Sequence, residues 1–147
     1  MSDDAVTAVE AQVALLLRLA DRNRRTTRLA STLERSAYLA LRLLDTTGPA
    51  GINEIADHLR LDASTVTRQV LAMEAAGYVT RERDVHDGRR AVVTMTPAGT
   101  AALAQTRTAR ADVYADILAE WSPDDRQHLA ELLTRLNADL DAHATRT

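Results

Sequence analysis

The chain has 147 residues, of which 46% are hydrophobic, with few glycines and prolines and no cysteine. This length and composition predict one globular, helix-rich domain with a substantial core. The absence of cysteine excludes disulfides, thiolate metal sites and a cysteine redox switch. No apolar run approaches the roughly 20 residues that a membrane helix needs, and no segment resembles a signal peptide. We therefore expect a soluble, cytoplasmic protein with no membrane partner.

All 18 basic residues are arginines, and the formal net charge is −3. This overall charge is unfavourable for nucleic-acid binding, but such binding depends on local positive charge and not on the total. The positions of the arginines along the predicted elements therefore decide whether DNA binding is a reasonable function.

The first third of the chain predicts two helices. Residues 5–24 carry apolar side chains every three or four residues, which is typical of a helix that packs against another helix. Ser31 and Glu34 match a capping box, which predicts that a second helix opens there and runs to about Asp45. The apolar positions of the first helix are Val6, Val9, Val13, Leu16 and Ala20, and its end carries Arg22, Arg24, Arg25 and Arg28.

The middle of the chain predicts a pair of helices joined by a tight turn. After a break at residues 48–51, where a short strand fits, Asn53 is expected to cap a helix that runs to about Leu59. A second helix is expected over 63–76, with Asp62 as its cap and a glycine after it as its stop. Three of its apolar residues lie at i, i+4 and i+7, so we expect them to face the core: Val66, Val70 and Met73.

The last part of the chain predicts a hairpin and two helices. Strands are expected at 78–83 and 91–96, with a His-Asp-Gly turn between them. A Thr-Pro pair at 96–97 is expected to begin a helix that runs to about residue 120, and a Ser-Pro pair at 122–123 begins the last helix. Five leucines line one side of that last helix: Leu129, Leu132, Leu133, Leu136 and Leu140.

The second helix of the central pair carries side chains that suit DNA. Arginine can bind guanine O6 and N7, glutamine can pair with adenine, and threonine can contact a thymine methyl group. A polar face alone is weak evidence, because any exposed helix has one, but the helix pair and the hairpin together form the layout of a winged helix-turn-helix. The candidate DNA-binding residues on this helix are Ser64, Thr65, Thr67, Arg68 and Gln69.

The hairpin tip is the second candidate DNA contact. Arg89 and Arg90 lie at the tip, and an arginine there can enter the minor groove, where the negative potential is concentrated. Asp84 and Asp87 would repel phosphate, so we expect them to support the wing by holding the arginines or by tying the wing to its own domain.

These segments resemble the MarR family of bacterial transcriptional regulators. The resemblance rests on DASTVTRQV and MEAAGYVTRERD in the central helix and first strand, on Asp84, Asp87 and Arg89 as a D-x-x-D-x-R pattern, and on VTMTPAG before the long helix. It implies a mainly α fold with a small β-hairpin wing: a winged helix-turn-helix lobe over 31–96 plus a dimerisation region formed by the helices of 1–30 and 97–147.

The resemblance also implies a function. Family members are homodimers that bind pseudo-palindromic operators in double-stranded DNA, and many are released by small phenolic or lipophilic ligands. The resemblance therefore implies a sequence-specific DNA-binding regulator that acts as a repressor and needs no cofactor. A ligand crevice is implied where the dimerisation helices meet the DNA-binding lobe. Tyr38, Arg24 and Arg28 are candidate ligand contacts. The alternative interpretation is that Tyr38 is an ordinary core residue and that the two arginines are ordinary charges at the end of a helix.

Two departures from the family pattern keep an alternative open. Leu71 and Ala72 stand where family members often have polar or basic residues, and acids outnumber arginines across residues 50–96. The alternative is a winged-helix dimer that acts through a protein partner without binding DNA. An enzyme is not expected, because no nucleophile elbow, P-loop or dinucleotide-binding motif is present. The histidines are too scattered for a metal site.

Overall fold

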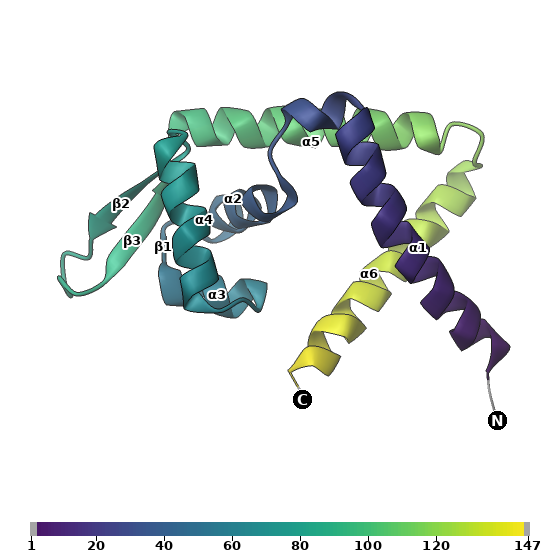
Figure 1. Ribbon diagram of the computed structural model, residues 1–147, viewed down its shortest axis with the longest axis horizontal. Helices are drawn as coiled ribbons and strands as arrows, with labels where there is room; N and C mark the ends of the chain where they lie inside the picture. Colours follow the sequence, from purple (N-terminus) through teal and green to yellow (C-terminus); the bar gives the residue numbers. More distant parts are fainter. Residues whose placement is uncertain (1–2, 146–147) are drawn as a thin grey trace. The chain divides into compact units, whose positions relative to one another are not determined.

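The computed structural model describes residues 3–145, which divide after Arg110 into two compact units. The first unit holds most of the elements (Figure 1). Its helices are α1 (Asp4–Thr26), the 3₁₀ helix η1 (Arg28–Ser31), α2 (Arg35–Thr47), α3 (Ile52–Leu59), α4 (Ala63–Ala75) and the larger part of α5 (Pro97–Ile117); its strands are β1 (Ala50–Gly51), β2 (Val79–Arg83) and β3 (Ala91–Met95). The second unit contains the end of α5 and α6 (Pro123–Ala144).

The strands form one small antiparallel sheet in the order β1-β3-β2. Val79 pairs with Met95 at the base of the hairpin and Arg83 pairs with Ala91 near its tip, while Gly51 pairs with Val92. This arrangement confirms the mainly helical fold with a hairpin wing. It also brings the start of α3, which follows β1 directly, beside the end of the hairpin that carries the tip arginines.

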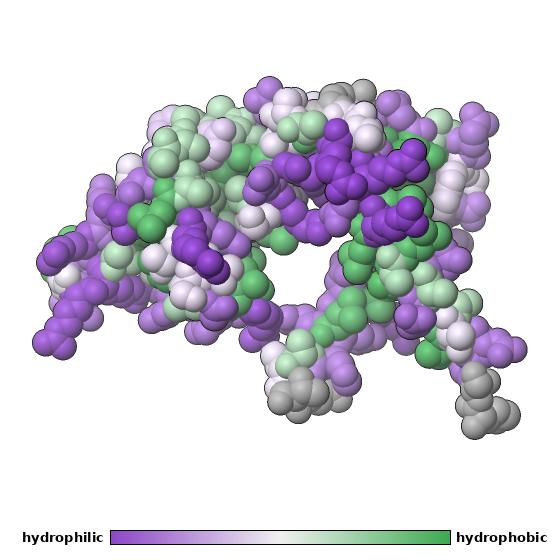
Figure 2. Space-filling model, in the orientation of Figure 1, coloured by the Kyte–Doolittle hydropathy of each residue, from purple (hydrophilic) through white to green (hydrophobic). Residues whose placement is uncertain are grey.

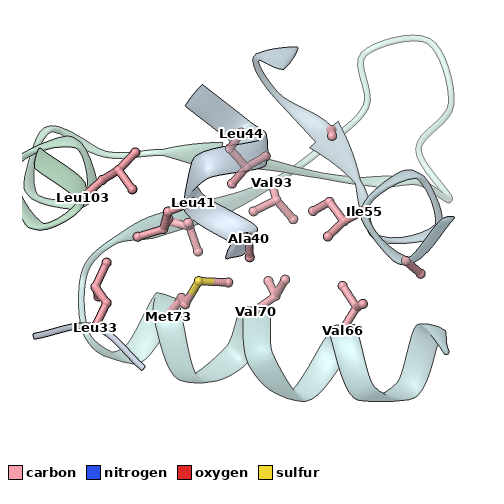
Figure 3. Packing of buried hydrophobic residues seen from close by; sticks show 13 residues of the cluster. Leu33, Ala40, Leu41, Leu44, Ile55, Val66, Val70, Met73, Val93 and Leu103 are labelled. Carbon is pink, nitrogen blue, oxygen red and sulfur yellow. The ribbon is translucent and has the colours of Figure 1, made fainter. Parts of the chain in front are cut away.

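A single apolar core holds the helix pair, the hairpin and the first turns of α5 together. Figure 3 shows Val66, Val70 and Met73 pointing from one side of α4 toward Ala40 and Leu41 of α2. The predicted stripe of α4 is therefore confirmed, since all three residues are buried. Burying a side chain of this size contributes about 1.5–3 kcal/mol. The rest of the core comes from Leu33, Leu44, Ala50, Ile55, Ala56, Val79, Val93 and Leu103.

Several predicted helix ends are confirmed by their hydrogen bonds. The Thr65 backbone N–H donates to Asp62 Oδ1 at 2.7 Å, and Gly77 follows α4 with φ of +85°, a conformation that glycine adopts without strain. The Gly99 N–H donates to Thr96 Oγ1 at the start of α5, and the Asp125 N–H donates to Ser122 Oγ at the start of α6, each at 3.1 Å.

Two predicted caps are wrong. The capping box at Ser31 does not open a helix, because Ser31 ends η1, which Thr27 caps, and α2 begins only at Arg35. Asn53 is not a cap, because β1 pairs with β3 through Gly51 and α3 starts directly after that strand, which places Asn53 inside the helix. Helix α5 ends at Ile117, slightly before the predicted residue 120.

Gly99 is fixed by contact with the hairpin. A Cβ atom at this position would lie 2.2 Å from the Tyr78 carbonyl oxygen and 2.9 Å from Met95 Cγ. Because the first contact is with backbone, it cannot be relieved by a side-chain rotation. We expect Gly99→Ala to destabilise the fold by at least about 1–3 kcal/mol, the usual cost of overpacking. Urea unfolding measures this, with Gly88→Ala as the control, since a Cβ at Gly88 meets nothing within 4 Å.

The two terminal helices expose apolar side chains. Helices α1 and α6 contain no buried residue in their described spans, and Figure 2 shows hydrophobic surface along α6 and part of α1. The exposed residues are Val6, Val9, Leu15, Leu16, Leu17 and Leu19 on α1, and Leu132, Leu133 and Leu140 on α6. Over residues 3–145, no helix is both long and apolar enough to cross a membrane.

Candidate nucleic-acid interface

The first turn of α4 is organised by Asp62. Besides the Thr65 N–H, its carboxylate accepts hydrogen bonds from the hydroxyl groups of Ser64 at 2.5 Å and Thr65 at 2.9 Å. These bonds lower the pKa of Asp62 to about 2, with the Ser64 hydroxyl as the largest cause and Thr65 next. The two hydroxyl groups therefore have fixed positions at the exposed start of the helix, where backbone N–H groups also favour an anion.

Arg68 continues the exposed face one turn later. It is exposed, and its Nη2 lies 3.4 Å from Thr65 Oγ1, so it extends over the same side of α4 as the first-turn hydroxyls. Thr67 is half-buried and donates from its hydroxyl to the Ala63 carbonyl oxygen. The structure thus brings Ser64, Thr65 and Arg68 together on a face opposite the buried stripe.

Gln69 is placed differently. It is half-buried and lines hollows next to residues at the start of α2, including Glu34 and Ser36. Within the described part of the chain, its Oε1 is a buried side-chain oxygen for which no hydrogen-bond partner is present. Gln69 is therefore on the flank of α4 that faces α2 and not on the outermost face with Arg68.

The hairpin tip is shaped by its two aspartates. Asp84 Oδ1 accepts from the His86 backbone N–H at 2.9 Å, and Asp87 Oδ1 accepts from the Arg89 N–H at 3.1 Å. Backbone bonds between Asp84 and Arg90 and between Arg90 and Asp87 close the loop. The carboxylates therefore hold the backbone of the tip, a role that differs from the predicted ones of holding the arginine side chains or tying the wing to its domain. The tip surface is hydrophilic (Figure 2).

The two tip arginines have different surroundings. Arg89 is exposed at the tip, next to the hollow at the start of α3. Arg90 forms an ion pair with Glu54 of α3, and its guanidinium lies against the backbone at Gly51. Sequence reasoning missed Glu54 as a partner, because only the pairing of β1 with β3 brings these segments together.

A second ion pair fastens the hairpin to α4. Arg81 of β2 donates from Nε and Nη2 to the Glu74 carboxylate at 3.1 and 3.0 Å. This two-bond geometry lowers the pKa of Glu74 and raises that of Arg81, in both cases mainly through the side-chain hydrogen bonds. No local pattern predicts the pair, since it depends on how β2 returns past α4. It fixes the hairpin relative to the face that carries Arg68.

The Asp62 contacts predict a specific response to acid. Because the folded-state pKa is lowered from 3.8 to about 2, the stabilisation is present above pH 3.8 and is lost as the pH falls from 3.8 through about 2. Asp62→Asn keeps a capping oxygen but cannot titrate. We expect the stability difference between wild type and Asp62→Asn to shrink over this window in denaturant unfolding. A stability difference that stays constant between pH 3.8 and about 2 would contradict the lowered pKa of Asp62.

Two hollows lie beside α4. The larger, about 550 Å³, is lined by residues at the start of α2, by the flank of α4 and by α5, and Arg68, Gln69 and Gln105 are among them. The smaller, about 470 Å³, includes Arg24 and Leu61. Within residues 3–145 no cluster of three or more His, Asp or Glu side chains is arranged to hold a metal ion.

Tyr38 and Arg24, two of the three candidate ligand contacts, have different surroundings in the structure. Tyr38 is half-buried against the core, with the Arg110 guanidinium 4.9 Å from its ring centre, a cation–π contact. Arg24 lines the smaller hollow. The Arg28 side chain lies outside the described part of the chain. The larger hollow therefore offers other residues than those that the sequence suggests.

Comparisons with known proteins agree with this geometry. Residues 33–91, which span the helix pair and most of the wing, match the model of the MarR family. The chain is 35% identical over 136 residues to a Bacillus subtilis protein named uncharacterized HTH-type transcriptional regulator YxaD, covering 92% of this chain and 95% of that protein.

Solved structures show the same fold. A MarR variant from E. coli complexed with operator DNA superposes with a TM-score of 0.73 at 18% identity, covering 92% of this chain and 99% of that one. The PcaV transcriptional regulator from Streptomyces coelicolor, in complex with its natural ligand, gives a TM-score of 0.73 at 20% identity, covering 94% and 98%. At these identities the likeness establishes the winged-helix fold alone.

Proposed function

Since this chain belongs to the MarR family and is a transcriptional regulator, we propose that it binds a pseudo-palindromic DNA operator as a homodimer and represses transcription. The observation that carries the proposal is the exposed face of α4, where Ser64, Thr65 and Arg68 lie together beside a hairpin that presents Arg89. A dimer that covers promoter DNA excludes polymerase, so repression is the expected direction.

Each part of the interface has a separate role. Arg68 is positioned to bind a guanine edge in the major groove, while the first-turn hydroxyls and the start of α4 are suited to phosphate. Thr67 and Gln69, which are half-buried, contribute at the margin of the face. Arg89 is the cation that the wing offers to the minor groove. Arg90 lies next to it but is engaged by Glu54.

Dimerisation is supported by the exposed apolar residues of α1 and α6. An exposed apolar surface of this kind is typical of a protein–protein interface. Each chain carries one winged helix-turn-helix lobe, so a dimer would place two of them on DNA. The helices of 1–30 and 97–147 would form the dimer, and 31–96 would form the reading lobe. The two α4 helices would then lie about one helical turn of DNA apart, roughly 34 Å.

The competing function is binding to a protein partner in place of DNA. It is motivated by the excess of acidic residues over arginines across residues 50–96. A gel shift with the DNA upstream of the protein's own gene separates the two. We expect a discrete complex that survives an excess of random duplex and weakens as salt rises. Equal binding to upstream and random DNA, or no binding at low salt, would favour the protein-partner function.

The wing makes a separate prediction. Arg89→Ala should weaken operator binding. It should also make the slope of log K against log[salt] shallower by roughly 0.9 for each phosphate that is no longer neutralised. Folding should be unchanged, because the side chain is exposed. Asp87→Ala should cost less, since Asp87 acts through the backbone of the tip. Fluorescence anisotropy at several salt concentrations measures both effects, and unchanged affinity of Arg89→Ala would reduce the wing to a solvated loop.

The larger hollow supports regulation by a small ligand. It is bordered by Arg68, which could bind a carboxylate, and by the buried Gln69 Oε1, which could accept a hydrogen bond from a phenol. A ligand there would draw Arg68 away from DNA, and the coupling would be reciprocal. Titrating salicylate-like acids into the operator complex tests this, with release expected; since the chain lacks cysteine, peroxide should have no such effect.

A further inference from the structure

Arg89 and Arg90 are adjacent in sequence, but of the two only Arg90 has a charged side-chain partner among the described residues. The Arg90 guanidinium contacts the Glu54 carboxylate in the first turn of α3. Both side chains are about half exposed, at 44% and 50%, so the pair is at the surface and not in the core. The Arg89 backbone N–H donates a hydrogen bond to Asp87 Oδ1 at 3.1 Å.

The Arg90 side chain also packs closely on the backbone of β1. A Cβ atom added at Gly51 would lie 2.8 Å from Arg90 Nε, 3.1 Å from its Nη2 and 3.3 Å from its Cζ. All three of the nearest atoms belong to this one side chain. Gly51 has φ of −76°, which any residue can adopt, so a side chain at this position would conflict with the guanidinium and not with the backbone conformation.

The sheet explains why these groups meet. Gly51 pairs with Val92 of β3, and Arg90 lies two residues before Val92, just where the wing tip joins the strand. Helix α3 begins directly after Gly51, so Glu54 is one turn away. The contact therefore joins the end of the wing to the first helix of the helix-turn-helix pair.

We propose that Arg90 is a positioning residue that holds the wing against the start of α3 through Glu54 and Gly51, so that Arg89 alone serves as the DNA-contacting arginine of the wing. The role of Arg89 rests on the proposed operator binding, whereas the attachment of the wing does not. An ion pair carries no net charge, so Arg90 contributes to operator affinity through the geometry of the wing. Displacing its guanidinium without removing a charge should weaken binding while the salt dependence stays as in wild type.

The discriminating variant is Gly51→Ala, which retains every charge but displaces the guanidinium. It is compared with Arg90→Ala and with the exchange of Glu54→Arg and Arg90→Glu in one chain. Arg107→Ala is the matched control, because Arg107 also pairs with an acid, Asp45, and is also 44% exposed. Glu54→Gln tests the same contact if Gly51→Ala does not fold.

The first readout needs no DNA. Amide hydrogen exchange at Asp84 and Arg90, whose N–H groups close the tip, should accelerate by up to about fivefold in Gly51→Ala and Arg90→Ala, the range that an exposed ion pair produces. The charge exchange should restore wild-type rates, and Arg107→Ala should leave them unchanged. Unchanged hydrogen-exchange rates in both Gly51→Ala and Arg90→Ala would show that Arg90 does not hold the wing, whether or not an operator is found.

The second readout is operator affinity at several salt concentrations. Arg89→Ala should reduce the salt slope, whereas Gly51→Ala, which keeps every charge, should lower affinity with the slope unchanged. If Arg90→Ala reduces the slope as much as Arg89→Ala, and the charge exchange restores nothing, Arg90 contacts DNA directly and the proposal is wrong. If neither the wild type nor any variant binds an operator, the proposed function fails. The hydrogen-exchange rates still decide whether Arg90 holds the wing against α3.

Discussion

Arg68→Ala is expected to lower affinity for the operator by about 1–3 kcal/mol for each specific base contact, and a dimer makes that contact in both half-sites. The expectation follows from the position of Arg68, which is exposed on the outer face of α4 beside hydroxyl groups fixed by Asp62. Loss of the guanidinium should relax preference at one base pair per half-site and leave the fold unchanged.

The measurement is a comparison of specific and random duplexes at one salt concentration. Arg42→Ala is a suitable control, because it removes one exposed arginine from α2 and lies outside the proposed interface. Arg68→Ala should bind the two duplexes with more nearly equal affinity, while Arg42→Ala should keep the wild-type ratio. If Arg68→Ala weakens both duplexes equally, Arg68 contacts phosphate and does not read bases.

Charged substitutions on the terminal helices are expected to separate the dimer. Leu16 of α1 and Leu140 of α6 are 49% and 55% exposed in the single chain. If partner contacts bury them, each contributes about 1.5–3 kcal/mol per chain, and both chains of a homodimer lose that contribution together. Leu16→Glu and Leu140→Glu should therefore sediment as monomers at concentrations where wild type is a dimer.

Val85→Glu is the control for this experiment. Val85 is 94% exposed at the wing tip, so the same change of an apolar residue to a charge should leave the dimer intact. The monomeric variants should also lose most operator affinity, because each monomer contacts one half-site only. A wild type that sediments as a stable monomer at micromolar concentration would contradict the dimer.

Local signals in the sequence predict much of the lobe. The cap at Asp62, the apolar spacing of Val66, Val70 and Met73, and the Thr-Pro and Ser-Pro starts of the long helices act within one or two turns, and all are confirmed. The wrong caps at Ser31 and Asn53 share a physical cause. In each case a neighbouring element competes for the segment: a 3₁₀ helix capped by Thr27, and a strand that pairs with β3.

The site is less predictable than the fold because its contacts join segments that are distant in sequence. The residue types identify α4 and the tip as DNA-contacting candidates, and the D-x-x-D-x-R pattern includes Arg89 only, but no local signal shows that Arg90 is engaged within its own chain. That distinction depends on Glu54, which only the sheet brings near. Likewise, the sequence predicts a DNA contact for both Gln69 and Arg68, because both are polar residues of the same helix. In the structure Gln69 faces α2 and is half-buried.

The central claim, that two copies of α4 read one pseudo-palindromic site, is tested most directly by a hydroxyl-radical footprint on the upstream DNA. We expect two symmetric protected segments whose centres lie about one helical turn apart, roughly 34 Å, with further minor-groove protection beside them that disappears in Arg89→Ala. A single asymmetric protected segment, or uniform protection that random DNA removes, would contradict it.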